Sequence, residues 1–234
     1  MQLFYNSEIK KSDLNFFFDK EESKHIVKVL RKKEGGKIFI TNGLGYLFES
    51  EIIMASEKKC EVKITKETFQ EPTTFYTHIA VAPTKMNERL EWFLEKATEI
   101  GIHEITPIIC DHSERKVYKI DRAEKIIQAA MKQSLHYYIP KINEPVSLSQ
   151  FIKSNITGQK FIAHCEETDK KTFKNEVKRD EKITILIGPE GDFSTKEINF
   201  AIENKFIPVT LGNTRLRTET AALVACHTIA LINE

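Results

Sequence analysis

ILIGPEGDF (residues 185–193) and VTLGNTRLRTETA (residues 209–221) are the two stretches that decide how this chain folds. In each of them a short apolar run ends at a glycine, Gly188 or Gly212, and a segment with helix signals follows. In an open α/β sheet such a loop, placed after a strand, presents its backbone amides to a ligand. We therefore expect the two loops to converge on one pocket.

The chain from residue 75 onward alternates between strand-like and helical patterns. Strand-like runs are expected at residues 75–82, 104–109, 160–164, 182–187 and 206–211. Helical stretches are expected at residues 87–100, 121–134, 147–153, 194–204 and 217–232. This alternation is typical of a parallel sheet covered by helices, so the sequence predicts an α/β fold for this part.

Residues 1–70 show a different and mostly strand-like pattern. Alternating runs at 37–41, 46–53 and 61–69 accompany a short apolar run at 16–18 and a turn signal at Asn42-Gly43. One helix is expected after a capping box formed by Asp19 and Glu22. A small β-barrel with one helix fits this pattern. Because residues 70–74 are polar and include Pro72, we predict two domains, residues 1–70 and residues 74–234.

Composition excludes several classes of protein. The 234 residues carry a net charge of +1, and the four cysteines form no CxxC pair, which argues against zinc and disulfide frameworks. The histidines show no HxxxH or HExxH spacing, so no metal is expected. The N-terminus lacks the features of a signal peptide, and no apolar run approaches the roughly 20 residues of a membrane helix. We expect a cytoplasmic protein without a membrane partner.

The glycine loops are not a known phosphate cradle. The only Gly-Lys pair, Gly36-Lys37, lacks the leading glycine and the hydroxyl of a P-loop. The GPEG stretch lacks the GxGxxG spacing that binds a dinucleotide, and no GxSxG elbow is present. A ligand that meets Glu190 and Asp192 is expected to be neutral or cationic.

The second loop places Arg215 and Arg217 at the start of a helix, where cations oppose the helix dipole. These arginines could pair with Glu219 or Glu190, or one of them could face an anion that binds and leaves. A second basic feature is the stretch 112–141, with a local charge of +4. By itself that stretch is typical of a solvated helix face, and it indicates phosphate binding only if other features point to nucleic acid.

IGPEGDFSTKE (residues 187–197) and LGNTRLRTETA (residues 211–221) resemble the two signature loops of the RsmE family, bacterial 16S ribosomal RNA (uracil-N(3))-methyltransferases of the SPOUT superfamily. HIVKVLRKKEGGKI (residues 25–38), PTKMNERLEWFLEKATEIGIHEITPI (residues 83–108) and AAMKQSLHYYIP (residues 129–140) resemble further segments of that family. The resemblance implies an N-terminal PUA-like β-barrel and a C-terminal SPOUT-type parallel sheet with a deep trefoil knot. It also implies S-adenosylmethionine as cofactor, a homodimer, and 16S ribosomal RNA of the small subunit as substrate.

The chemistry of methyl transfer, the family resemblance and the basic surface together assign residues to three roles. Arg217 is expected to stabilise the uracil anion, with Glu219 and Glu190 orienting it or accepting the proton. The cofactor is expected to contact Ile187, Gly188, Pro189, Glu190, Gly191, Leu211, Gly212, Leu216, Arg217 and Thr218. The RNA is expected to contact His25, Arg31, Lys32, Lys85, Arg89, Arg115 and Arg122.

The chain departs from the family pattern at three places. Asp192 replaces a usual glycine, which could alter the rim of the cofactor pocket, and His136 and Asn213-Thr214 replace arginine-containing positions. Two other classes stay open on the residues alone. A small-molecule α/β enzyme would leave the barrel and the basic stretch unexplained, and a non-catalytic RNA-binding factor would leave LRTETA without a role.

Overall fold

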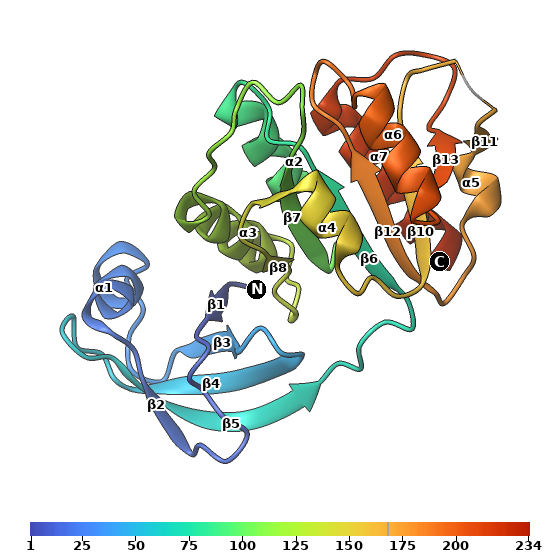
Figure 1. The fold of residues 1–234 in the computed structure, drawn as a ribbon. Coiled ribbons are helices and arrows are strands. Elements are labelled where there is room, and N and C mark those ends of the chain that lie inside the picture. The colour runs from blue at the N-terminus through green and yellow to red at the C-terminus, as the bar shows by residue number, and fades with distance from the viewer. Residues whose placement is uncertain (168) are drawn as a thin grey trace. The chain divides into compact units, whose positions relative to one another are not determined.

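The computed structural model describes residues 1–167 and 169–234, which form two compact units (Figure 1). The first unit comprises Met1–Pro72 and Met131–Ile139, and the second comprises Thr73–Ala130 and Pro140–Glu234. The sequence predicts a single boundary near residues 70–74, whereas the segment Met131–Ile139 groups with the first unit.

A curled five-stranded sheet forms the first unit. Its strands lie in the order β1 (Leu3–Tyr5), β3 (Lys37–Thr41), β4 (Tyr46–Met54), β5 (Glu61–Phe69) and β2 (Asn15–Phe17). Only β1 and β3 are parallel, and the β4–β5 register shifts twice. Such bulges increase the local twist and bend the strand. The predicted strands are confirmed, and β1 adds an edge strand too short to show an alternating pattern.

One helical segment packs on this sheet. α1 (Lys20–Lys24) begins after Asp19, whose side chain accepts a hydrogen bond from the Glu22 amide at 2.8 Å. This is one half of the predicted capping box, because the Glu22 carboxylate lies 2.9 Å from His25 Nδ1 instead. It continues as a π-helical turn, η1 (His25–Val29), that buries Ile26 completely. The core of the unit consists of Phe4, Ile9, Phe18, Ile26, Ile38, Ile40, Phe48, Ile52, Cys60 and Val62.

The segment Met131–Ile139 joins the first unit through the turn after β3. The amide of Gly45 donates to the Tyr137 carbonyl at 2.9 Å, and the amide of Ile139 donates to the Gly43 carbonyl at 3.0 Å. Gly43 and Gly45 both have positive φ angles, and a Cβ atom at Gly45 would collide with the Tyr138 hydroxyl. This close approach explains why glycine stands at both positions.

The second unit contains an eight-stranded sheet in which every pairing is parallel. Its strands run in the order β11 (Lys171–Thr172), β13 (Ile207–Thr210), β10 (Gln159–Ala163), β12 (Lys182–Ile187), β6 (Tyr76–Val81), β7 (Glu104–Ile109) and β8 (Lys141–Ile142), with β9 (Val146–Ser147) also paired to β7. The predicted parallel sheet is thereby confirmed. β8, β9 and β11 have two residues each and escape any period-two pattern.

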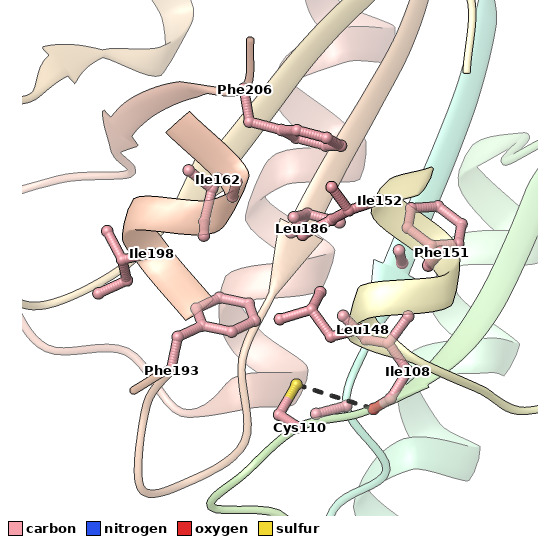
Figure 2. Packing of buried hydrophobic residues seen from close by; sticks show 13 residues of the cluster. Ile108, Cys110, Leu148, Phe151, Ile152, Ile162, Leu186, Phe193, Ile198 and Phe206 are labelled. Carbon is pink, nitrogen blue, oxygen red and sulfur yellow. Dashed lines mark hydrogen bonds between the residues drawn. The ribbon is translucent and has the colours of Figure 1, made fainter. Parts of the chain in front are cut away.

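Helices cover this sheet. They are α2 (Asn87–Ile100), α4 (Leu148–Lys153), α5 (Phe173–Glu176), α6 (Thr195–Glu203), α7 (Thr218–Asn233) and α3 (Asp121–Gln133), which continues into the first unit. Leu186 of β12 packs with Phe193, Ile198 and the residues of α4 in one apolar cluster (Figure 2). α2 and α7 contact each other, and α7 contacts β6 and β12. Across residues 1–167 and 169–234, no helix has the length and apolar character to cross a membrane.

Local signals set the helix ends next to the glycine loops. Ser194 and Glu197 form the predicted capping box, with each side chain accepting from the other residue's amide. Gly101 ends α2 in the left-handed conformation that glycine adopts without strain. α7 begins at Thr218 with Arg217 as its N-cap residue, and the Arg217 side chain makes no capping hydrogen bond.

Candidate active site

The two glycine loops meet at the carboxyl edge of the parallel sheet. β12 and β13 flank β10 and point the same way, so the loops that follow Ile187 and Thr210 leave the sheet at the same edge. The Thr218 hydroxyl donates to the Gly188 carbonyl at 3.0 Å and joins the loops directly. The predicted convergence is therefore what the structure shows.

A cleft with two adjoining lobes lies between these loops. The larger lobe has a volume of about 440 Å³ and the smaller lobe about 310 Å³. Both lobes share a wall made of Ala163, Cys165, Arg215, Leu216 and Ala221. The residues predicted to contact a cofactor all line one or both lobes, except Gly191.

The glycines have different reasons to be glycine. A Cβ atom at Gly188 would lie 3.1 Å from the Phe193 ring, which packs in the apolar cluster of Figure 2. A Cβ atom at Gly191 would lie 3.2 Å from the His112 Cβ atom, away from the cleft lining. Gly212 has open space around it but a φ of 151°, a backbone conformation that side chains disfavour.

Two carboxylates beside the cleft, half-buried Glu190 and buried Glu219, each have a buried oxygen without a partner among the described residues. Glu190 accepts a hydrogen bond from the Lys85 amide on Oε1 at 3.0 Å, while its Oε2 atom is buried. Glu219 is only 7% exposed, and its Oε2 atom is also buried. Within the described part of the chain, neither Oε2 atom meets a donor. Such atoms are costly to bury and are usually satisfied by a ligand, a water or an ion.

Arg215 and Arg217 lie exposed at the edge of the cleft. Among residues 1–167 and 169–234, no ion pair joins either guanidinium to Glu219 or Glu190, which was the simplest structural explanation for them. The arrangement leaves two cations beside a cleft with acidic walls. Those cations favour the approach of an anion to the cleft.

A third loop that the sequence did not reveal completes the cleft. Ala163, His164 and Cys165 follow β10 and line the larger lobe. His164 is buried, and neither of its ring nitrogens has a hydrogen-bond partner among the described residues. Burial lowers the pKa of His164, and the charge of Lys170 lowers it further. No glycine marks this loop, and only the sheet order, with β10 between β12 and β13, places it here.

Asp192, which replaces a usual family glycine, holds this third loop. Its φ of 63° is left-handed, which explains why glycine suits the position. Its Oδ2 atom accepts from the Cys165 amide at 2.7 Å, and its Oδ1 atom accepts from the Phe193 amide at 2.8 Å. Asp192 also lines the smaller lobe. The departure therefore changes the rim of the cleft and leaves both glycine loops intact.

The residues predicted to contact RNA fall in both units. In the first unit His25 lies 2.9 Å from the Glu22 carboxylate, and Arg31 and Lys32 line a shallow surface cavity. In the second unit Arg89 lies half-buried on α2.

The other predicted RNA contacts of the second unit already have protein partners. Lys85 pairs with Glu114 at 2.8 Å, and Arg122 pairs with Glu91 at 2.7 Å. Arg115 donates to two backbone carbonyls, those of Thr84 and Lys85. Across the part of the chain that the structure describes, no group of three His, Cys, Asp or Glu side chains could hold a metal ion.

Comparison with known proteins identifies relatives along the whole chain. Residues 70–230 match the model of an RNA methyltransferase domain, and residues 18–65 match that of an RNA methyltransferase PUA domain. Ribosomal RNA small subunit methyltransferase E of Buchnera aphidicola is 34% identical over 223 residues, which cover 91% of this chain and 87% of the relative.

Two solved structures have the same fold over nearly their full lengths. A probable rRNA-methyltransferase from Porphyromonas gingivalis has a TM-score of 0.92 and 38% identity, covering 100% of this chain and 98% of that one. A putative methyltransferase from Legionella pneumophila, solved with the bound cofactor SAM, has a TM-score of 0.88 and 28% identity, covering 99% and 97%.

Proposed function

Because this chain belongs to the RNA methyltransferase family that includes ribosomal RNA small subunit methyltransferase E, we propose that it transfers a methyl group from S-adenosylmethionine to N(3) of a uridine in 16S ribosomal RNA. The observation that carries the proposal is the cleft, in which loops from Gly188 and Gly212 meet beside carboxylates with buried oxygens and beside exposed guanidinium groups. That combination suits a cationic small molecule inside the cleft and an anion at its edge.

The cleft residues fit S-adenosylmethionine. Each lobe has a volume within the range of small-molecule sites, about 300 to 1,000 Å³. Leu211, Leu216 and Ile187 offer apolar walls for a ring, and the glycines let backbone groups approach it. The unsatisfied oxygens of Glu190 and Glu219 suit a ligand that carries positive charge and hydroxyl donors. When bound, S-adenosylmethionine supplies an electrophilic methyl group.

Arg217 is the residue that we assign to the uracil. The imide nitrogen becomes a good nucleophile only after it loses its proton, and the negative charge then spreads onto the two carbonyl oxygens. Arg217 lies at the cleft edge without an ion-pair partner in the described residues, so its guanidinium can meet that charge without breaking an existing pair. A preorganised cation aimed at developing negative charge commonly lowers a barrier by several kcal/mol.

Glu219 and Glu190 complete the proposed machinery. The sequence leaves open whether they orient Arg217 or accept the proton. Neither carboxylate is ion-paired with Arg217 in the described structure, and each keeps a buried oxygen available. This favours proton acceptance, or a bond to a substrate or cofactor donor, over the orientation of Arg217.

The same proposal includes the partners and the wider architecture. We assign the first unit, as a PUA-like domain, to RNA binding through His25, Arg31 and Lys32, and the second to methyl transfer. We further infer a homodimer, a trefoil knot in the second unit, assembled small subunits as substrate and a cytoplasmic location where those subunits are made. Binding to RNA should weaken with rising salt, because phosphate contacts release counterions.

Nucleoside mass spectrometry of small-subunit RNA from cells with and without the gene tests the activity. The expected result is loss of one N(3)-methyluridine in the deletion strain, and an unchanged set of modified nucleosides contradicts the proposal. Two assays on the pure protein separate the alternatives. A small-molecule enzyme of another class will fail to bind S-adenosylmethionine in calorimetry. A non-catalytic RNA-binding factor will bind unmodified small subunits without transferring a labelled methyl group to them.

A further inference from the structure

We propose that Arg115 is a positioning residue for Glu190 and acts through the backbone of the loop that joins β6 to α2; this inference rests on the proposed methyltransferase function. The guanidinium of Arg115 donates from Nη2 to the Lys85 carbonyl at 2.7 Å and from Nε to the Thr84 carbonyl at 3.2 Å. Two adjacent carbonyls are thus held by one rigid planar group. This contact fixes the course of the chain at residues 84–85.

The loop that Arg115 holds is the one that holds Glu190. The Lys85 amide donates to Glu190 Oε1 at 3.0 Å. The peptide group between Thr84 and Lys85 therefore presents its carbonyl to Arg115 and donates its N–H to the carboxylate of Glu190. With Oε1 fixed on this amide, the other oxygen, Oε2, is the atom left for a ligand, and Glu190 lines the smaller lobe. The orientation of that oxygen depends on where the loop lies.

The segment after β7 that carries Arg115 also touches the GPEGDF loop. His112 Nδ1 lies 3.1 Å from the carbonyl oxygens of Gly191 and Asp192, so residues 112–115 contact both the loop that bears Glu190 and the loop that binds its Oε1. Glu114 adds an ion pair to the Lys85 ammonium at 2.8 Å, and this pair raises the pKa of Lys85. Both of those side chains are largely exposed, so the pair contributes little. Of these two contacts, the pair of Arg115 hydrogen bonds is therefore the stronger restraint on the loop.

This role differs from the RNA contact that the sequence predicts for Arg115. A side chain that contacts an RNA phosphate needs a positive charge at the surface, which lysine also provides. The contact with the Thr84 and Lys85 carbonyls uses two separate nitrogens of a rigid planar guanidinium, Nε and Nη2, a geometry that the single ammonium nitrogen of lysine does not reproduce. Removing a side chain that contacts an RNA phosphate reduces the salt dependence of RNA binding, whereas disturbing the position of Glu190 reduces turnover. The two roles are therefore separable by experiment.

The experiment compares Arg115→Ala and Arg115→Lys with Glu190→Gln and with the double variant Arg115→Ala/Glu190→Gln. Methyl transfer to small subunits is measured at saturating cofactor and RNA, and binding of small subunits is measured at several salt concentrations. We expect both Arg115 variants to lose about tenfold or more in kcat. The salt slope, which is the slope of the logarithm of the RNA-binding constant against the logarithm of the salt concentration, should be unchanged. The double variant should be no slower than Glu190→Gln alone, because the two residues act through one contact chain. Lys174→Ala, which removes an exposed charge on α5, serves as the control with unchanged turnover.

Three results would overturn the inference in favour of a phosphate contact. They are additive losses of kcat in the double variant, wild-type kcat in Arg115→Lys, and a salt slope reduced by about one in Arg115→Ala. Thermal unfolding of each variant identifies any that fail to fold. Exchange of the Lys85 amide hydrogen, followed by NMR, tests the contact chain without turnover. We expect faster exchange in Arg115→Ala, and unchanged exchange overturns the inference even if the wild-type protein transfers no methyl group. Absent wild-type transfer, by contrast, overturns the proposed function and not the contact chain.

Discussion

The two edges of the parallel sheet bury polar groups in opposite ways. At the amino edge Glu104 accepts from Tyr76 at 3.0 Å, from Asn143 at 2.7 Å and from Lys141 at 3.2 Å. Thr106 connects this cluster to the ring of His78 at 2.8 Å. At the carboxyl edge, by contrast, Glu190, Glu219 and His164 all have buried polar atoms that no described residue satisfies.

This difference separates stability from function within one layer of the fold. A satisfied network returns the desolvation energy of its members and fixes the geometry of the strands that carry it. An unsatisfied buried oxygen or nitrogen costs about 1 to 3 kcal/mol unless something fills it. The amino edge is therefore expected to tolerate no loss of a partner, and the carboxyl edge to become more stable when its ligand binds.

The largest effect is expected from Arg217→Ala. Arg217 is exposed and makes no capping hydrogen bond, so folding should be unchanged while the charge that meets the uracil anion is lost. We expect kcat to fall by about 10² to 10³ at saturating cofactor. Arg217→Lys keeps the charge without the planar guanidinium, and its kcat should lie between those of the wild-type protein and Arg217→Ala. Near wild-type turnover in Arg217→Ala would remove the proposed role of this residue.

Gly212→Val is expected to abolish measurable cofactor binding. The φ of 151° disfavours a branched side chain, so the turn after β13 must rearrange, although no atom lies within 4 Å of the added Cβ atom. Calorimetry with S-adenosylmethionine measures the loss. Gly35→Val is the matched control, because Gly35 has a φ of 79° and lies in the other unit. It should lower the melting temperature and leave the affinity intact; unchanged affinity in Gly212→Val contradicts the pocket assignment.

Two conservative substitutions, Glu104→Gln and Glu219→Gln, test the two edges against each other. Glu104→Gln replaces an acceptor that three donors share, and should lower the free energy of unfolding by about 1 to 3 kcal/mol with cofactor affinity unchanged. Glu219→Gln removes the charge of a buried carboxylate whose Oε2 atom has no partner among the described residues, and should leave stability unchanged or raised while cofactor binding or turnover falls. Chemical denaturation and calorimetry measure both quantities. Equal destabilisation by the two changes would end the distinction between the edges.

Most of the fold could be predicted from the sequence, because in long helices and strands the apolar residues recur at a regular spacing. The strands β7 and β12, the helix α2 and the capping box at Ser194 lie where the pattern places them. The two-residue strands, α5 and the three-residue β1 could not be predicted, since so few residues carry no period. The knot leaves no local signal at all; only the family resemblance implies it, and it stays a prediction.

The site could be predicted only in part, for a related reason. Gly188 and Gly212 mark their own loops, because glycine serves where the backbone needs unusual angles or close approach. Cys165, His164 and the carbonyl contacts of Arg115 depend on which strands and loops become neighbours, which sequence spacing does not reveal. Charge alone assigned Arg115 to RNA, whereas the structure shows two backbone acceptors within its reach.

The smallest effect concerns pH and the satisfied edge. Burial lowers the pKa of His103 to about 4, and its ring accepts or shares hydrogen bonds with the Thr77 amide and the Thr73 hydroxyl. The folded state therefore resists a proton that the unfolded chain accepts near its ordinary value of 6.5. This contribution to stability is fully present above pH 6.5 and is lost as the pH falls toward about 4, with a slope of at most about 1.4 kcal/mol per pH unit.

His103→Gln tests this contribution, because glutamine can still hydrogen-bond the Thr77 amide but does not titrate. The pH dependence of the free energy of unfolding between pH 6.5 and 4 should become shallower by up to one proton. Half-buried His78, whose pKa is also lowered by desolvation, keeps part of the slope in that variant. An unchanged slope would mean that another group takes up the proton. The hydrogen bonds at the amino edge would then not keep His103 neutral in the folded state. Cofactor affinity should stay the same throughout, because His103 lies at the start of β7, at the edge of the sheet opposite the glycine loops.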